Sequence, residues 1–309
     1  MTRTTRRDDD ILPALDTMDC MKAVLASLLI LLASCSDDAA VPPAATSSST
    51  GTGGAAGGTA SGGVGGVGGA SDGGGGSGGH GGTEPRPPDP ELDAKCTPGF
   101  DLEMLDTDPA RQALFLDAVG GDPEALVQDI GRKVCRILYR DAEEVPDSTH
   151  LTLRIEYAVG DVAWKAGEGA DITVMISTDH LQNLANQGAD MATEVIGILF
   201  HEMAHMYQHD DHDGDGVDGG LIEGIADFVR IEAGYTPTGA EPSGEGSWNE
   251  GYTHTGFFLV WVDDQYDDFV YALNLSMSSE DGKTWTLQSF VDITGKTVDQ
   301  LWDEYRDSL

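Results

Sequence analysis

A glycine-rich tract limits which part of this 309-residue chain can fold. Residues 51–82 hold 19 of the 41 glycines, mixed with Ala, Ser and Thr, and this composition buries too little apolar surface to offset the entropy of ordering the chain. Gly/Ser-rich segments behave as flexible coil, and prolines between residues 85 and 90 stiffen the end of the tract. We therefore expect a disordered Gly/Ser/Pro-rich tether at 36–94 and one folded domain at 95–309, which is long enough for a sizeable core.

An apolar segment that precedes the tether is typical of an export signal. The sequence MKAVLASLLILLASCSDD, which begins at Met21, has a basic residue followed by an apolar run of signal-peptide length. No run reaches 18 apolar residues, so we expect no conventional membrane span. The Leu-Ala-Ser-Cys that ends at Cys35 resembles a bacterial lipobox, in which the cysteine is lipidated. Residues 1–35 are therefore interpreted as an N-terminal extension, with translation starting at Met21, and a lipoprotein signal peptide.

The same region and the overall charge predict a location and exclude some partners. Ser36 rather than Asp follows Cys35, which favours an outer-membrane lipoprotein in the cell envelope, with a secreted protein as the alternative. The chain has 17 Lys+Arg against 54 Asp+Glu, a formal net charge of −37, and it lacks the basic clusters that bind phosphate. We therefore expect no nucleic-acid partner. We also expect membrane contact only through the lipid anchor, and a monomer.

The remaining cysteines predict a disulfide. Cys20 precedes the expected start and Cys35 would carry lipid, which leaves Cys96 and Cys135. Two cysteines in an exported domain allow one pairing, and two buried free thiols are the alternative. A loop of about 40 residues would stabilise the fold by roughly 4 kcal/mol in the chain-entropy model.

The spacing of apolar residues predicts an α+β fold with a small sheet and a helical C-terminal half. The expected strands are 151–157 and 171–177, with a turn over 160–169 between them. The expected helices are 108–116, 123–139, 193–207, 221–233, 252–262, 284–293 and 298–306.

An H-E-x-x-H motif lies in the strongest predicted helix. His201 and His205 are at positions i and i+4, so they share one helix face and can both reach one zinc ion. Glu202 is rotated by about 100° from His201, so it flanks the metal and can take a proton from zinc-bound water. A helix with two surface histidines and an ion-paired Glu is the alternative.

A second helix offers the third ligand that a hydrolytic zinc site needs. Glu223 and Asp227 are also at i and i+4, among core-type residues. If their face packs against the histidine face, Glu223 can ligate zinc and Asp227 can accept a hydrogen bond from the far nitrogen of a ligating imidazole. A solvated acidic face is the alternative.

The connector between the two helices allows other interpretations. Asp211, ten residues after His201, is a competing third ligand in the pattern H-E-x-x-H-x-x-G-x-x-D, but Gln208 replaces the glycine that a left-handed turn favours. The segment 211–216 also resembles the start of an EF-hand Ca²⁺ loop, whose twelfth position would be Ile222 instead of Glu. A Ca²⁺ site and a polar connector without an ion both stay open.

Together these motifs resemble the basic secretory protein family of plants and bacteria, which is regarded as a group of zinc peptidases of the H-E-x-x-H superfamily. The similarity covers roughly residues 95–309. The E-x-x-x-D of the second helix also resembles the thermolysin-like, Glu-zincin arrangement. The matching segments are HEMAHMYQ at 201–208, EGIADFVR at 223–230, Gly251-Tyr252 with Phe257-Phe258-Leu259, and Thr294–Tyr305.

The resemblance implies a zincin-like metallopeptidase domain with an active-site helix and a second, ligand-bearing helix. Carried over by position, His201, His205 and Glu223 are zinc ligands and Glu202 is the base. Asp227 is then the hydrogen-bond partner of a ligand. The chain departs from the family in its acidity, because the plant members are basic.

A further departure is His254, which stands where an aliphatic residue is expected. Either Tyr252 or His254 could therefore be the group that stabilises the oxyanion. The implied function is zinc-dependent hydrolysis of peptide or protein substrates by an envelope-tethered protease, with Glu202 activating zinc-bound water. A non-catalytic surface binding module stabilised by Zn²⁺ or Ca²⁺ is the alternative.

Overall fold

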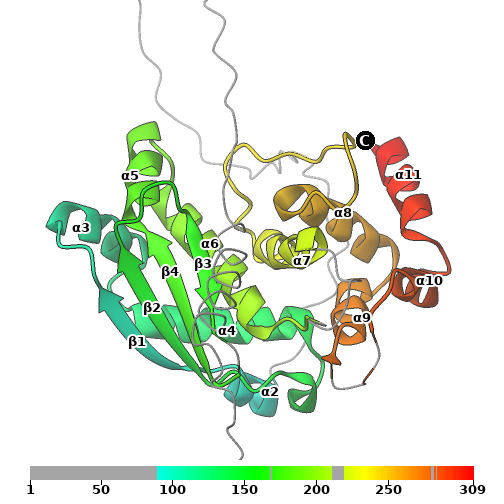
Figure 1. Ribbon diagram of the computed structural model, residues 1–309, viewed down its shortest axis with the longest axis horizontal. Coiled ribbons are helices and arrows are strands. Elements are labelled where there is room, and N and C mark those ends of the chain that lie inside the picture. Colours follow the sequence, from blue (N-terminus) through cyan, green and yellow to red (C-terminus); the bar gives the residue numbers. More distant parts are fainter. Residues whose placement is uncertain (1–88, 168, 211–218, 280–281, 283) are drawn as a thin grey trace, which may run out of the picture. The chain divides into compact units, whose positions relative to one another are not determined.

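The computed structural model describes residues 89–167, 169–210, 219–279, 282 and 284–309 (Figure 1). The lipobox Cys35, the tether up to residue 88, and Asp211 with the calcium-like loop lie outside the described residues. Within the part of the chain that is described, no helix has the length and apolar character needed to cross a membrane.

One small sheet holds the strands in the order β1-β2-β4-β3. β1, β2 and β4 run parallel, and the short edge strand β3 pairs antiparallel with β4. Together with the helices, this mixed sheet confirms the predicted α+β class. The strands are β1 (Gly99–Met104), β2 (His150–Glu156), β3 (Ala163–Ala166) and β4 (Asp171–Ser177).

The two strands predicted from sequence, 151–157 and 171–177, correspond to β2 and β4, whereas β1 and β3 were not predicted. The prediction of a turn over 160–169 is wrong for Ala163–Ala166, because these residues form β3. This strand has four residues and depends on pairing with β4, where Trp164 lies opposite Met175. Local composition does not reveal a partner that is distant in the sequence.

The sheet has one packed face and one polar face. Along β2, buried residues alternate with half-buried polar ones. On the polar face, His150 Nε2 lies 3.1 Å from an Asp101 carboxylate oxygen, and Arg154 donates to Glu103 at 3.0 Å. Because successive side chains of a strand point to opposite faces, this alternation fixes which face the helices cover. The buried members of β2 are Leu151, Leu153 and Ile155.

Helix α6 lies at the centre of the helical part. It contacts α3, α4, α5 and α7 as well as β3 and β4, and most of its residues are buried on every side (Figure 1). The predicted helices correspond to α3, α4, α6, α7, α8, α10 and α11, whereas α2, α5 and α9 were not predicted. The bounds are α2 (Pro90–Lys95), α3 (Pro109–Ala118), α4 (Pro123–Leu138), the 3₁₀ turn η1 (Ala142–Glu144), α5 (Thr178–Gln187), α6 (Met191–Tyr207), α7 (Gly219–Glu232), α8 (Tyr252–Gln265), α9 (Phe269–Ser276), α10 (Gln288–Thr294) and α11 (Val298–Ser308).

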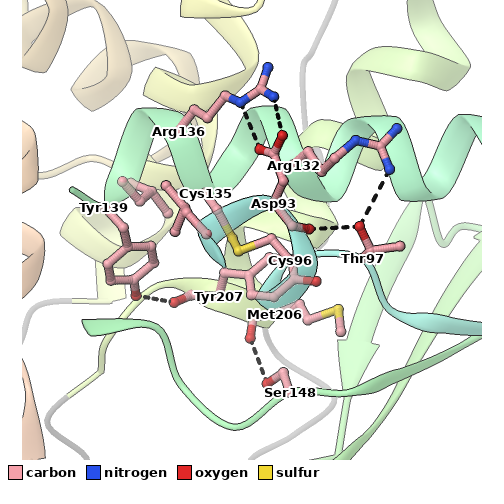
Figure 2. Close-up of a disulfide and its surroundings, with 12 residues drawn as sticks. Asp93, Cys96, Thr97, Arg132, Cys135, Arg136, Tyr139, Ser148, Met206 and Tyr207 are labelled. Atoms are coloured by element: carbon pink, nitrogen blue, oxygen red, sulfur yellow. Dashed lines mark hydrogen bonds and ion pairs between the residues drawn. A yellow bond between two sulfur atoms is a disulfide. The ribbon is translucent and has the colours of Figure 1, made fainter. Parts of the chain in front are cut away.

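Both ends of α6 are held by side chains. At its start, the Asp190 carboxylate accepts a hydrogen bond from the backbone N–H of Ala192 at 3.2 Å. At its end, two of the final carbonyl groups accept hydroxyl hydrogen bonds, one from Ser148 to Met206 at 3.0 Å and one from Tyr139 to Tyr207 (Figure 2). These bonds satisfy groups that a helix leaves without an internal partner.

The folded part begins before Lys95, the start expected from the sequence. Asp89 caps α2, whose Leu92 is buried, so these residues belong to the fold and not to the tether. Directly after α2, Cys96 forms a disulfide with Cys135 on α4, beside the contacts drawn in Figure 2. The two cysteines are 39 residues apart in the sequence. The bond links the end of α2 to α4, which packs against α6.

A buried carboxylate joins the end of β1 to two helices. Asp106 is 4% exposed and accepts hydrogen bonds from Arg111 of α3 at 2.7 and 2.9 Å and from the hydroxyl of Thr178 at the start of α5. The Arg111 guanidinium holds the pKa of this carboxyl well below its usual range, although burial opposes the shift. The ionised form therefore stabilises the fold.

We predict that Asp106→Asn lowers the free energy of unfolding at pH 7 by about 1.5–3 kcal/mol, the usual contribution of hydrogen bonds to a charged group. The folded-state pKa lies below the unfolded value of about 3.9, so the stabilisation is present above that pH and is lost as the pH falls toward the folded-state pKa. Urea unfolding between pH 7 and pH 3 should show the difference between wild type and variant shrinking below about pH 4. Substitution of the exposed Asp117 by Asn on α3, the helix that carries Arg111, is the control. A pH-independent difference for Asp106→Asn would contradict the assignment.

Candidate metal centre

The two histidines of the H-E-x-x-H motif point their Nε2 atoms toward one another. His201 and His205 lie one turn apart on α6, with ring centroids 4.7 Å apart and Nε2 atoms 3.1 Å apart. His201 is buried and His205 is only partly accessible. The i, i+4 spacing therefore gives the shared face that the sequence predicts.

Glu223 reaches this pair from α7. One of its carboxylate oxygens lies 3.1 Å from Nε2 of His201 and 3.3 Å from Nε2 of His205. Burial raises the pKa of the Glu223 carboxyl, but hydrogen bonds from the two histidines outweigh burial and lower the pKa well below its usual range. The carboxylate is therefore ionised where it faces the imidazoles.

Asp227 holds His201 from the opposite side of the ring. Its Oδ1 lies 2.7 Å from Nδ1 of His201, and its side chain is 4% exposed. Burial lowers the pKa of His201, but Asp227 and Glu223 outweigh burial and raise it. A carboxylate can only accept from Nδ1–H, so this contact fixes the ring with Nε2 toward Glu223 and His205.

The donor atoms of His201, His205 and Glu223 all lie within 4.8 Å of one another, so the three side chains could hold one metal ion. Two imidazole nitrogens and one carboxylate oxygen are a ligand set of catalytic zinc sites. Ca²⁺ prefers six to eight oxygen ligands, which this group does not offer. By donor chemistry, the described residues fit a zinc ion.

Glu202 lies inside the protein beside this group. Its side chain is 3% exposed, and the charges of His201, His205, Glu223 and Asp227 all act on it. Burial raises the pKa of the Glu202 carboxyl, and the two histidines oppose this shift. The buried Glu202 carboxyl is therefore a neighbour of the candidate metal ligands.

Two glycines let α8 approach α7 closely at this point. A Cβ on Gly224 would lie 2.2 Å from Cγ2 of Thr255, and one on Gly256 would lie 3.1 Å from Cβ of Asp227. The hydroxyl of Thr255 accepts from the backbone N–H of Gly251 and donates to the carbonyl of Trp248, each at 2.8 Å, so it cannot move aside freely. The start of α8 is thereby held next to the ligand helix.

This approach brings Tyr252 to the site and leaves His254 outside it. The Tyr252 ring stacks on His201 with centroids 6.0 Å apart and an interplanar angle of 13°. Its φ of 46° is unusual for a residue with a side chain and marks a backbone held by its surroundings. His254 instead has Nε2 2.9 Å from the Ser247 carbonyl oxygen and packs on Trp302.

Gln208 is a neighbour of the site to which the sequence analysis gave no role. The chain leaves α6 at this residue with φ −66° and ψ 149°, so it is extended and not in the left-handed turn of the pattern that would lead to Asp211. The amide nitrogen of Gln208 lies 3.0 Å from Nδ1 of His205. The i+3 spacing from His205 is the signal that could have found this contact.

A family model described as "Peptidase of plants and bacteria" matches residues 97–305. The match runs from just before β1 to the last turns of α11, and it includes both helices that carry the candidate ligands. No curated protein and no solved structure matched the chain.

We predict that Gly224→Ala destabilises the protein by about 1–3 kcal/mol, because the added methyl group overlaps Thr255 in a packed helix interface. Urea unfolding of the two proteins measures the difference. Gly219→Ala on the same helix is the matched control: no described atom lies within 4 Å of the added Cβ, so it should be neutral or stabilising. Equal effects of the two substitutions would argue against the close approach of α7 and α8.

Proposed function

This chain belongs to the family of peptidases of plants and bacteria, and we propose that it hydrolyses peptide bonds with a zinc ion bound by His201, His205 and Glu223. The observation that carries the proposal is the convergence of these three donors within 4.8 Å, on two helices that the family match includes. The expected substrates are peptides or proteins, and we propose that the chain acts on them as a monomer.

Zinc in such a site supplies Lewis acidity: it acidifies a water molecule and polarises the carbonyl group of the substrate. The protein supplies the orientation of the ligands. Asp227 fixes the ring of His201 through a 2.7 Å contact to Nδ1, which leaves Nε2 for the metal. Two carboxylates, the partly buried Glu223 and the buried Asp227, would balance the positive charge that the site would hold.

Glu202 is the proposed general base. It accepts a proton from the attacking water and transfers it to the leaving amine nitrogen, so the carboxylate ends each turnover unchanged. Its buried place beside the two imidazoles supports this role, because a purely structural metal site has no use for a base there.

Tyr252 is the proposed donor to the oxyanion that forms on the substrate carbonyl. Its ring lies parallel to that of His201 at the start of α8, in a backbone conformation that a tyrosine rarely adopts. His254 is less suited, because its Nε2 is engaged with the Ser247 carbonyl group and its ring packs on Trp302.

We also propose that the enzyme is tethered to the cell envelope through lipid on Cys35, with the glycine-rich segment as the spacer. The lipobox-like Leu-Ala-Ser-Cys and the composition of residues 36–88 support this. A flexible segment of about 55 residues reaches roughly 40 Å on average, which would hold the folded part clear of a membrane surface. The membrane would then be contacted only through the anchor.

We predict that Glu202→Gln lowers peptidase activity by about 10²–10⁴-fold, the usual contribution of a positioned base, while the protein keeps its zinc. The measurement combines cleavage of a casein-like substrate with metal analysis of the same full-length protein. Removal of zinc with a chelator should abolish wild-type cleavage, and added zinc should restore it.

The exposed Glu143→Gln on η1 is the control and should leave both readouts unchanged. Cleavage by Glu202→Gln at the wild-type rate would refute the proposed base. Wild-type protein that binds zinc stoichiometrically but cleaves no substrate would favour the non-catalytic binding module instead.

A further inference from the structure

The two imidazoles of the proposed zinc site are held by different chemical groups. Nδ1 of His201 meets the carboxylate of Asp227, whereas Nδ1 of His205 meets the carboxamide of Gln208 at 3.0 Å. Gln208 is 7% exposed and caps the C-terminal end of α6, three residues after His205. A carboxylate only accepts hydrogen bonds, but a carboxamide can either donate or accept.

The amide nitrogen of Gln208 is the atom that faces the His205 ring. This Nε2 lies 3.0 Å from Nδ1 of His205 and also donates to the carbonyl oxygen of Ile222 on α7 at 3.3 Å. The Oε1 of Gln208 is buried and has no hydrogen-bond partner among the described residues. A buried acceptor without a partner is unfavourable and uncommon in proteins, so it needs an explanation.

The orientation of the Gln208 amide is linked to the nitrogen on which His205 carries its proton. A neutral imidazole carries one N–H, and if Nδ1 accepts from Gln208, that proton is on Nε2. Nε2 is the atom that faces His201 and Glu223, and it must be unprotonated to bind a metal. When it does so, the ring keeps its single proton on Nδ1, which then requires an acceptor.

We propose that Gln208 is the positioning residue of His205 and that its amide turns over when the cation binds, so that Oε1 replaces Nε2 at the ring. The turn gives up the 3.3 Å hydrogen bond from Nε2 to the Ile222 carbonyl group, and the hydrogen bond from Nδ1–H to Oε1 takes its place. The oxygen that has no partner in the described structure would then accept from Nδ1–H. This inference rests on the proposed function, because it takes His205 Nε2 as a zinc ligand. Asp227 needs no such change, since it accepts from His201 in both states.

Two substitutions of similar size separate this role from a merely structural one. Gln208→Met removes both hydrogen-bonding groups and should weaken zinc binding about 10–100-fold, the usual effect of losing such a partner, without lowering the melting temperature of the metal-free protein. Gln208→Glu offers only acceptors and should bind zinc at least as tightly as wild type. Competition against a chelator on the full-length protein measures each affinity.

The control is Gln112→Met on α3. The Gln112 amide also donates to a backbone carbonyl group, that of Asp106, but this residue is not among the candidate ligands or their partners. It should leave zinc affinity unchanged. A second readout needs no substitution: long-range ¹⁵N–¹H spectra of the wild type should show the His205 proton on Nε2 without zinc and on Nδ1 with zinc.

The outcomes distinguish the inference from the function on which it rests. Wild-type protein that binds no zinc would refute the proposed function itself. If wild type binds zinc but Gln208→Met binds it equally tightly, or if the His205 proton is on Nδ1 in both states, the role of Gln208 is overturned. Weaker binding by the Met variant together with undiminished binding by the Glu variant supports it.

Discussion

The buried 2.7 Å contact between Nδ1 of His201 and Oδ1 of Asp227 joins the two helices that carry His201, His205 and Glu223. An unpaired charge inside a protein is strongly unfavourable, so each of these groups requires the other. A second buried pair joins the same helices farther along, where Arg230 donates to Glu194 at 3.1 Å. Gly197 leaves room for that arginine, because a Cβ there would lie 2.6 Å from its Nε.

These two pairs fix how far α7 can slide along α6. Along α6, Glu194 comes before His201. Their partners on α7 come in the reverse order, Asp227 before Arg230. A shift of either helix would break both pairs and leave charged groups buried without partners. The convergence of Glu223 on the histidines therefore follows from the register of the whole interface and not from its own contacts alone.

The sheet and α8 complete the surroundings of this interface. β3 and β4 contact α6 on one side, while the other face of the sheet carries partly buried ion pairs such as Glu103 with Arg154. On the far side, Gly224 lets α8 approach α7 and brings Tyr252 over His201. The site thus lies where three helices meet, and small residues at their contacts make this possible.

Much of the fold was predictable where the signal is local. α4, α6 and α7 have clear apolar periodicity and caps such as Asp122 and Asp190, and they were predicted almost to their ends. β1, β3, α2, α5 and α9 were missed, and several of them depend on distant partners, as α5 does through the hydrogen bond from Thr178 to Asp106. In α9, for instance, buried Asn274 accepts from the backbone N–H of His209, 65 residues away.

In the candidate site, too, some features follow from the local sequence and others only from the tertiary structure. The sequence by itself determined that His201 and His205 share a face, and likewise Glu223 and Asp227, because the helical repeat is a local property of the chain. Only the tertiary structure decided that these two faces meet, that Tyr252 and not His254 lies over the ring, and that Gln208 contacts His205. Those outcomes depend on how close the helices approach and at what register, and packing between residues far apart in the sequence sets both.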